Sequence, residues 1–169
     1  MTMRLALLFV LPTGCATSLS LHGGPSLDGA GKPGAEGRVE LAAAGGSPDF
    51  RMYTSIAGGG GRAGSYESSH GAFAFEGGVE GGRDHRWAVG GLLTSRFFLH
   101  GADTFAGGTG ASAQYLYRFK RAGGENGAYA IGPRFVTEVS WGGPRDTLVI
   151  VQFALVLRWI TFDTTGMSY

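Results

Sequence analysis

Polar and apolar residues alternate along most of the chain beyond residue 37. Between residues 86 and 100 the odd positions carry Trp87, Val89 and Leu93, whereas the charged side chain of Arg96 occupies an even position. Successive side chains of a β-strand point to opposite faces, so this two-residue period predicts strands with two different environments. Runs with the same period predict seven strands, over residues 38–42, 50–56, 70–80, 86–100, 111–120, 128–141 and 147–162.

The links between these runs are short and rich in glycine. They lie at residues 45–49, 58–65, 81–85, 122–127 and 142–146. A parallel crossover needs about a dozen residues or more, so links of this length join antiparallel neighbours. The sequence therefore predicts an all-β fold, an antiparallel up-and-down meander that closes into a β-barrel. A transmembrane helix over 147–162 is the less favoured interpretation, because the run is short and Gln152 and Arg158 would lie in hydrocarbon.

The environment on each side of these strands decides the class of protein. A soluble barrel turns its apolar side inward, whereas a membrane barrel turns it outward to lipid and keeps polar side chains in the lumen. Several runs are long enough for a tilted membrane strand of about 9–11 residues. Aromatic residues near the ends of the apolar faces match an interfacial girdle: Trp87, Tyr129, Trp141 and Trp159. We therefore expect the apolar face to contact lipid.

The segments from 38 to 162, about three quarters of the chain, resemble the small eight-stranded outer-membrane barrels of Gram-negative bacteria. The run at 155–162, LVLRWITF, is similar to the aromatic-ended last strand by which such barrels are recognised for insertion, although seven residues follow it here. The resemblance implies an outer-membrane location, membrane lipid as partner and an even number of strands. We expect eight, the missing one being residues 17–23 or a division of 101–121 at Thr109-Gly110. Ten strands is the alternative.

Charged residues on the polar faces fall inside such a barrel. They are Arg51, Glu76, Glu80, Arg86, Arg96, Arg118, Lys120, Arg134, Glu138 and Arg158. A buried unpaired charge is expensive, so the three glutamates are expected to pair with arginines. An eight-stranded lumen is just wide enough for side chains to fill. We expect a lumen plugged by ion pairs and a structural role in the envelope, with a narrow anion-preferring pore along the arginine excess as the alternative.

Two further functions stay open on the sequence. A soluble lipocalin-like barrel would turn the charged face to water and bind a small lipophilic ligand inside. An outer-membrane lipid hydrolase would need a nucleophile, a base and an acid, for which Ser68, His70 and Glu76 are loosely spaced candidates. Because these three fall on the lumen face, we expect no catalytic activity. His100 and Asp103 are too few ligands for a metal site.

The first fourteen residues have the features of a signal peptide. Arg4 is followed by an apolar run over 5–11 and by two small residues before Cys15, the single cysteine. This order resembles a bacterial lipobox, in which a lipid is attached to the cysteine that begins the mature chain, although Pro12 stands where that pattern has leucine. We expect residues 1–14 to be removed and Cys15 to be acylated, with an ordinary secretory signal as the alternative.

Composition sets the domain organisation and excludes some partners. Residues 15–37 are rich in glycine, proline and serine and predict a flexible tether, so the barrel domain is expected over 38–169. A single cysteine leaves no intrachain disulfide framework. With 14 basic and 13 acidic residues, the chain has no electrostatic case for binding nucleic acid. No cofactor is implied.

Overall fold

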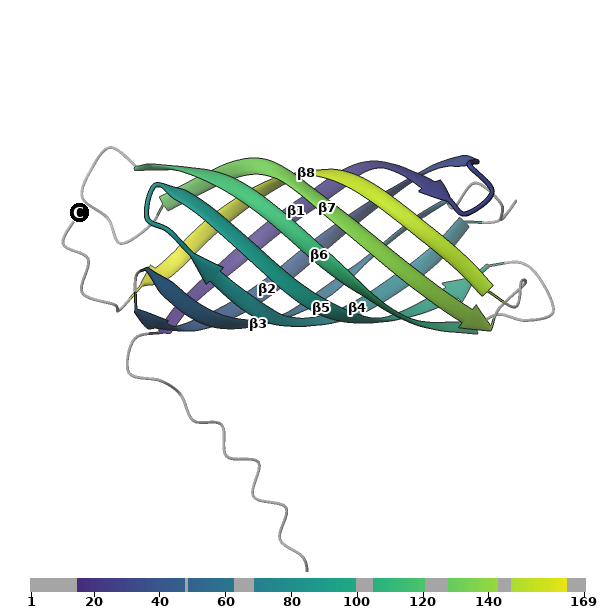
Figure 1. Cartoon of the computed structure of the whole chain (residues 1–169), viewed down its shortest axis with the longest axis horizontal. Coiled ribbons are helices and arrows are strands. Elements are labelled where there is room, and N and C mark those ends of the chain that lie inside the picture. Colours follow the sequence, from purple (N-terminus) through teal and green to yellow (C-terminus); the bar gives the residue numbers. More distant parts are fainter. Residues whose placement is uncertain are drawn as a thin grey trace, which may run out of the picture.

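The computed structural model is a closed β-barrel (Figure 1). It describes residues 15–47, 49–62, 69–99, 105–120, 128–142 and 147–163. These form the strands β1 (Cys15–Asp28), β2 (Pro33–Ser47), β3 (Phe50–Arg62), β4 (Ser69–Gly81), β5 (His85–Phe98), β6 (Phe105–Lys120), β7 (Ala128–Gly142) and β8 (Thr147–Asp163). Each strand pairs antiparallel with its neighbours in sequence, and β8 closes the barrel on β1. The predicted all-β meander of eight strands is confirmed.

β1 and the first residues of β2 occupy the segment that was predicted to be a tether. β1 pairs with β2 in one register along its length, starting at Cys15. The prediction of a flexible tether over 15–37 is therefore wrong, and the barrel begins at β1. The segment becomes a strand despite its glycine and proline content because it has a hydrogen-bonded neighbour on each side. A Cβ at Gly24 would lie 2.8 Å from Ala154 Cα, so the close approach of β1 to β8 requires glycine there.

Other strand boundaries also differ from the prediction. Residues 105–120 form the single strand β6, which contains Thr109 and Gly110, so the eighth strand does not come from a division at that point. It is β1, which contains residues 17–23, the other position that the sequence offered for it. The glycines at 58–61 continue β3 instead of forming a turn. The apolar run at the C-terminal side forms the strand β8, not a helix. Among the residues that the structure describes, no helix has the length and apolar character needed to cross a membrane.

The barrel is apolar outside and charged inside. On β3, Met52 is 70% exposed whereas its neighbour Arg51 is 1% exposed. On β5, the corresponding fractions are 62% for Leu93 and 1% for Arg96. A soluble lipocalin-like barrel has the opposite arrangement, so that alternative is contradicted. Many charged side chains are buried in the lumen, together with apolar ones such as Phe98 and Leu116, and this lumen is the candidate site.

Candidate functional site: the charged barrel interior

The structure buries almost all of the predicted lumen charges inside the barrel. They are Arg51, Glu76, Glu80, Arg86, Arg96, Arg118, Arg134, Glu138 and Arg158. Lys120 is the last residue of β6, and its side chain lies outside the described residues. The prediction missed further buried charged or titratable side chains, namely His22, Asp28, Glu36, Arg38 and Glu40, whereas His70 is buried in the lumen as expected. His22, Asp28 and Glu36 belong to the segment that had been assigned to a tether, whereas Arg38 and Glu40 lie in the predicted strand 38–42.

The Arg96 cluster joins two arginines to two glutamates. Arg96 Nη1 donates to Glu36 Oε1 at 2.5 Å, and Arg96 Nη2 donates to Glu138 Oε2 at 2.8 Å. Arg38 Nη2 lies 2.9 Å from Glu36 Oε2 and 3.5 Å from Glu138 Oε2. His70 Nε2 lies 3.2 Å from Glu36 Oε1. Four strands, β2, β4, β5 and β7, thus meet at one charge-balanced network.

The Arg134 cluster is built around the carboxylate of Glu76. Arg134 on β7 pairs with Glu76 on β4 and donates to Glu40 Oε2 on β2 at 3.1 Å. Tyr53 donates its hydroxyl to Glu76, and Ser112 Oγ donates to Glu76 Oε1 at 2.6 Å. A carboxylate can accept several hydrogen bonds, so these donors together offset its removal from water.

The Arg158 cluster lies nearer the end where β1 begins and β8 ends. Arg158 donates to Glu80 Oε2 at 3.0 Å and to Ser20 Oγ at 3.2 Å. Its Nη2 lies 3.7 Å from Glu40 Oε1, which links this cluster to the Arg134 cluster. Arg86 Nη1 lies 3.9 Å from Glu80 Oε1. Each of the three glutamates that the sequence assigned to the lumen therefore pairs with at least one arginine, as predicted.

The balance of charge in the lumen differs from the predicted arginine excess. In the described residues the interior holds seven buried arginines and six buried carboxylates. The difference arises because Asp28, Glu36 and Glu40 add three carboxylates, whereas Arg38 adds one cation. A nearly neutral interior removes most of the electrostatic basis for an anion-preferring pore.

Glycines on the inner face make room for these long side chains. A Cβ at Gly90 would lie 2.9 Å from Glu76 Oε1, and a Cβ at Gly108 would lie 2.6 Å from Thr94 Oγ1. Real Cβ atoms do not approach other atoms so closely without displacement. The ion pairs of the Arg134 and Arg96 clusters therefore depend on inward glycines, which explains part of the high glycine content.

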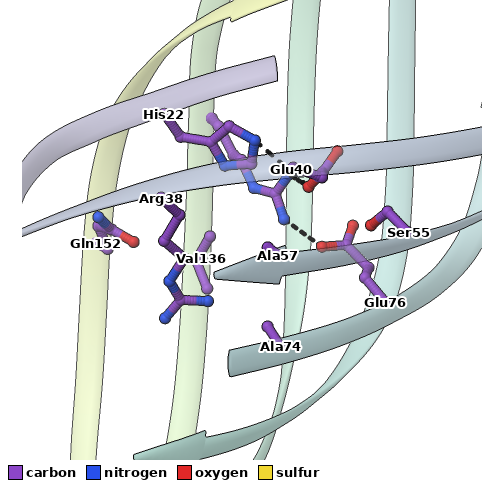
Figure 2. Close-up of a pocket in the computed structure, with 10 residues that line it drawn as sticks. His22, Arg38, Glu40, Ser55, Ala57, Ala74, Glu76, Val136 and Gln152 are labelled. Carbon is purple, nitrogen blue, oxygen red and sulfur yellow. Dashed lines mark hydrogen bonds and ion pairs between the residues drawn. The ribbon is translucent and has the colours of Figure 1, made fainter. Parts of the chain in front are cut away.

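A small cavity lies among the charged side chains (Figure 2). Its volume, counted as space open to the centre of a water molecule, is about 10 Å³. A cavity of about one such probe sphere holds about one water. The lining residues are His22, Arg38, Glu40, Ser55, Ala57, Ala74, Glu76, Arg134, Val136 and Gln152. The cavity is far too small for a substrate or a lipophilic ligand.

The predicted interfacial aromatics lie on the outer face near the strand ends. Trp87, Trp141 and Trp159 are 42%, 51% and 42% exposed, and Tyr129 is partly exposed. Tyr129 stacks on Trp159 with ring centroids 6.3 Å apart and on Phe119 at 6.0 Å. Trp87 lies near the start of β5, at this same end of the barrel, and Trp141 lies at the opposite end.

A second aromatic group stands with Trp141 at the opposite end. Phe97 lies 6.1 Å from Phe73 and 5.3 Å from Phe105 between ring centroids. All three rings are exposed on the outer face. Both ends of the apolar surface therefore carry aromatic side chains, the arrangement of an interfacial girdle.

The structure does not assemble the other candidate sites. His70 and Glu76 are both buried in the lumen, but His70 contacts Glu36 and Arg96 whereas Glu76 belongs to the Arg134 cluster. Their proposed companion Ser68 lies outside the described residues, as do His100 and Asp103. Within the described part of the chain, no group of three or more histidine, cysteine, aspartate or glutamate side chains could hold a metal ion.

The lipidation candidate stands at the edge of the described chain. Cys15 is the first residue of β1, opposite Gly45, and its side chain is outside the described part. The predicted signal peptide, residues 1–14, is outside it as well.

Comparison with known proteins supports the fold. No protein-family model matches the chain, and no curated protein is similar to it in sequence. Among solved structures, the crystal structure of Neisserial surface protein A is similar in fold, with a TM-score of 0.56 and 12% sequence identity. The match covers 89% of this chain and 97% of that chain. At this level of identity the likeness applies to the architecture of the barrel.

Proposed function

We propose that the chain is an outer-membrane β-barrel with a structural role in the Gram-negative envelope and with membrane lipid as its surrounding partner. The observation that carries the proposal is the inversion of the two faces, with exposed apolar side chains outside and buried ion pairs inside. Strands of 13 to 17 residues exceed the roughly 9–11 that a tilted membrane strand needs. Closure on β1 also leaves no open sheet edge in hydrocarbon.

The lumen is proposed to be a structural plug. The three clusters, with the other buried side chains, occupy the interior, and the cavity beside them has room for about one water. The near balance of buried arginines and carboxylates supports a plug over an anion-preferring path. We therefore expect no stepped conductance when the protein is reconstituted in planar bilayers, and defined steps would contradict the plug.

Cys15 is proposed to carry a lipid anchor. Because β1 begins at this residue, an attached acyl group would enter the membrane directly beside the barrel, with no tether between them. Metabolic labelling with a fatty acid should label the wild-type chain and leave Cys15→Ser unlabelled. Equal labelling of the two chains, or none of the wild type, would reject acylation at this position.

We propose no enzymatic activity. The links between strands range from two residues at 48–49 to seven at 121–127, which leaves little chain outside the membrane for adhesion or receptor binding. Many buried charged groups are engaged in ion pairs, and the cavity among them has room for about one water and none for a substrate. The direct test of a catalytic role is the His70→Ala variant, whose cells should keep an unchanged lipid A.

The membrane assignment is tested by heat-modifiable migration on a detergent gel. The unboiled protein should run faster than the boiled protein, because the folded barrel binds less detergent and is more compact. Recovery of a folded, soluble monomer in buffer without detergent would reject the membrane barrel, because the apolar outer face would then be exposed to water.

A further inference from the structure

The cavity in the lumen lies where two of the ion clusters meet. Its lining includes Arg38 from the Arg96 cluster and Glu40, Glu76 and Arg134 from the Arg134 cluster, with His22 beside them (Figure 2). These side chains come from β1, β2, β4 and β7. The cavity therefore separates two charged networks in the same lumen.

Several polar atoms of the lining lack a hydrogen-bond partner in the described residues. They are His22 Nε2, Arg38 Nε, Glu40 Oε1 and Arg134 Nε. His22 Nε2 is 3.4 Å from Glu40 Oε2, an ion-pair distance without hydrogen-bond geometry. Buried polar groups in native proteins are almost always hydrogen-bonded to protein or to ordered water. Four such atoms, all on residues that line one cavity, point to a bound ligand that donates as well as accepts.

Charge and size select that ligand. A cation in the cavity would lie against the guanidinium groups of Arg38 and Arg134, and an anion would lie against the carboxylates of Glu40 and Glu76. The occupant must therefore be neutral, must donate to Glu40 Oε1, and must accept from an arginine Nε. A volume of about 10 Å³ matches a single water and excludes larger molecules.

We propose that this cavity is a binding site for one ordered water molecule. The water donates to Glu40 Oε1 and accepts from Nε of Arg38 or Arg134, so it joins the Arg96 cluster to the Arg134 cluster. The plug then becomes one hydrogen-bonded network instead of two. The inference concerns the interior alone and does not depend on the membrane in which the barrel resides.

A crystal structure of the detergent-solubilised wild-type protein tests the site. We expect one water peak in the cavity, about 2.7–3.2 Å from Glu40 Oε1 and from an arginine Nε. Crystals soaked in rubidium bromide separate water from ions, because rubidium and bromide both give anomalous peaks. An empty cavity, in a map that shows other ordered waters, would overturn the proposal, and so would an anomalous peak in it.

A filling variant provides the matched comparison. Ala74 lines the cavity, so Ala74→Val should remove the water peak while the barrel keeps its fold. Ala43 lies on the outer face of β2, and Ala43→Val should leave the peak in place. A peak that persists in Ala74→Val would contradict the assigned position. If that variant fails to fold, the wild-type density and the ion soak decide the question alone.

Discussion

Replacing Arg96 by methionine removes the positive charge at the centre of the Arg96 cluster while keeping a long side chain. Arg96 is 1% exposed and donates to Glu36 at 2.5 Å and to Glu138 at 2.8 Å. Removing one partner of a buried ion pair costs about 3–5 kcal/mol, because the remaining charge stays buried without compensation. Arg38 remains 2.9 Å from Glu36, so we expect the lower end of that range, about 3 kcal/mol in the free energy of unfolding.

The matched control is Arg83→Met in the turn between β4 and β5. Arg83 Nε lies 3.1 Å from Asp49 Oδ1, but both side chains are 70% exposed. Exposed pairs contribute less than about 1 kcal/mol. Urea unfolding in phospholipid vesicles, followed by tryptophan fluorescence, measures both variants against wild type. If the two substitutions cost the same small amount, the interior is not desolvated and the reasoning fails.

A double-mutant cycle separates charge from packing. If the cost of Arg96→Met comes from the unpaired carboxylates, Glu138→Gln should cost less in the Arg96→Met background than in the wild type. Strict additivity of the two substitutions would show that the lost charge pairing is not the cause.

The remaining predictions concern the inner and outer faces of the barrel. In Gly90→Ala the added Cβ would lie 2.9 Å from Glu76 Oε1. We expect this substitution to lower the free energy of unfolding, measured with urea, by about 1–3 kcal/mol. The neighbouring Gly91→Ala, whose methyl would meet nothing nearer than 3.9 Å, should change stability by less than about 0.5 kcal/mol; equal effects would contradict the inward packing. Leu93→Arg places a charge on the middle of the outer belt and should cost about 2–4 kcal/mol, whereas Phe50→Arg at the start of β3 should cost at most about 1 kcal/mol. If Phe50→Arg destabilised the protein in vesicles more than Leu93→Arg, the assigned positions of these residues in the membrane would be contradicted.

The alternating pattern was sufficient to predict most of the barrel. Strands such as β5 and β7 carry bulky outward residues and charged inward ones, so their two faces are visible in the sequence itself. Short links then required antiparallel neighbours, and closure followed from the resemblance to small membrane barrels. The pairing of Glu76, Glu80 and Glu138 with arginines followed from the cost of burying a charge alone.

Residues 15–37 were assigned to a tether, with a strand over 17–23 only as one option, because local composition describes the isolated segment and not its place in the barrel. Glycine and proline weaken an isolated strand, so residues 15–37 have the composition of a linker. In a closed barrel the ladder on both sides supplies the stability that local propensity lacks. A signal was present, since Glu36, Arg38 and Glu40 share one face at a spacing of two residues, and recognising it would have supplied the missing carboxylates.

Strand periodicity does not predict which charged side chains on different strands contact each other. A two-residue period assigns Arg134 to the inner face, but its distance from Glu40 depends on the register of each strand and on the closure of β8 on β1. The sequence also does not identify the inward glycines, because it does not distinguish a glycine in a turn from one that packs against an ion pair. Gly108 is recognised as a packing residue only when Thr94 and Glu138 are placed around it.

Contact between the outer face of the barrel and lipid is measured most directly by site-directed spin labelling. The chain has one cysteine, so a Cys15→Ser background allows a single nitroxide to be placed by Leu93→Cys on the outer belt or by Arg83→Cys in a turn. In vesicles, a nitroxide at 93 should collide frequently with oxygen, which dissolves in lipid, and rarely with a water-soluble nickel chelate, whereas a nitroxide at 83 should show the opposite preference. Equal access of the nickel chelate to both positions would contradict the proposal that the apolar face of this barrel contacts lipid.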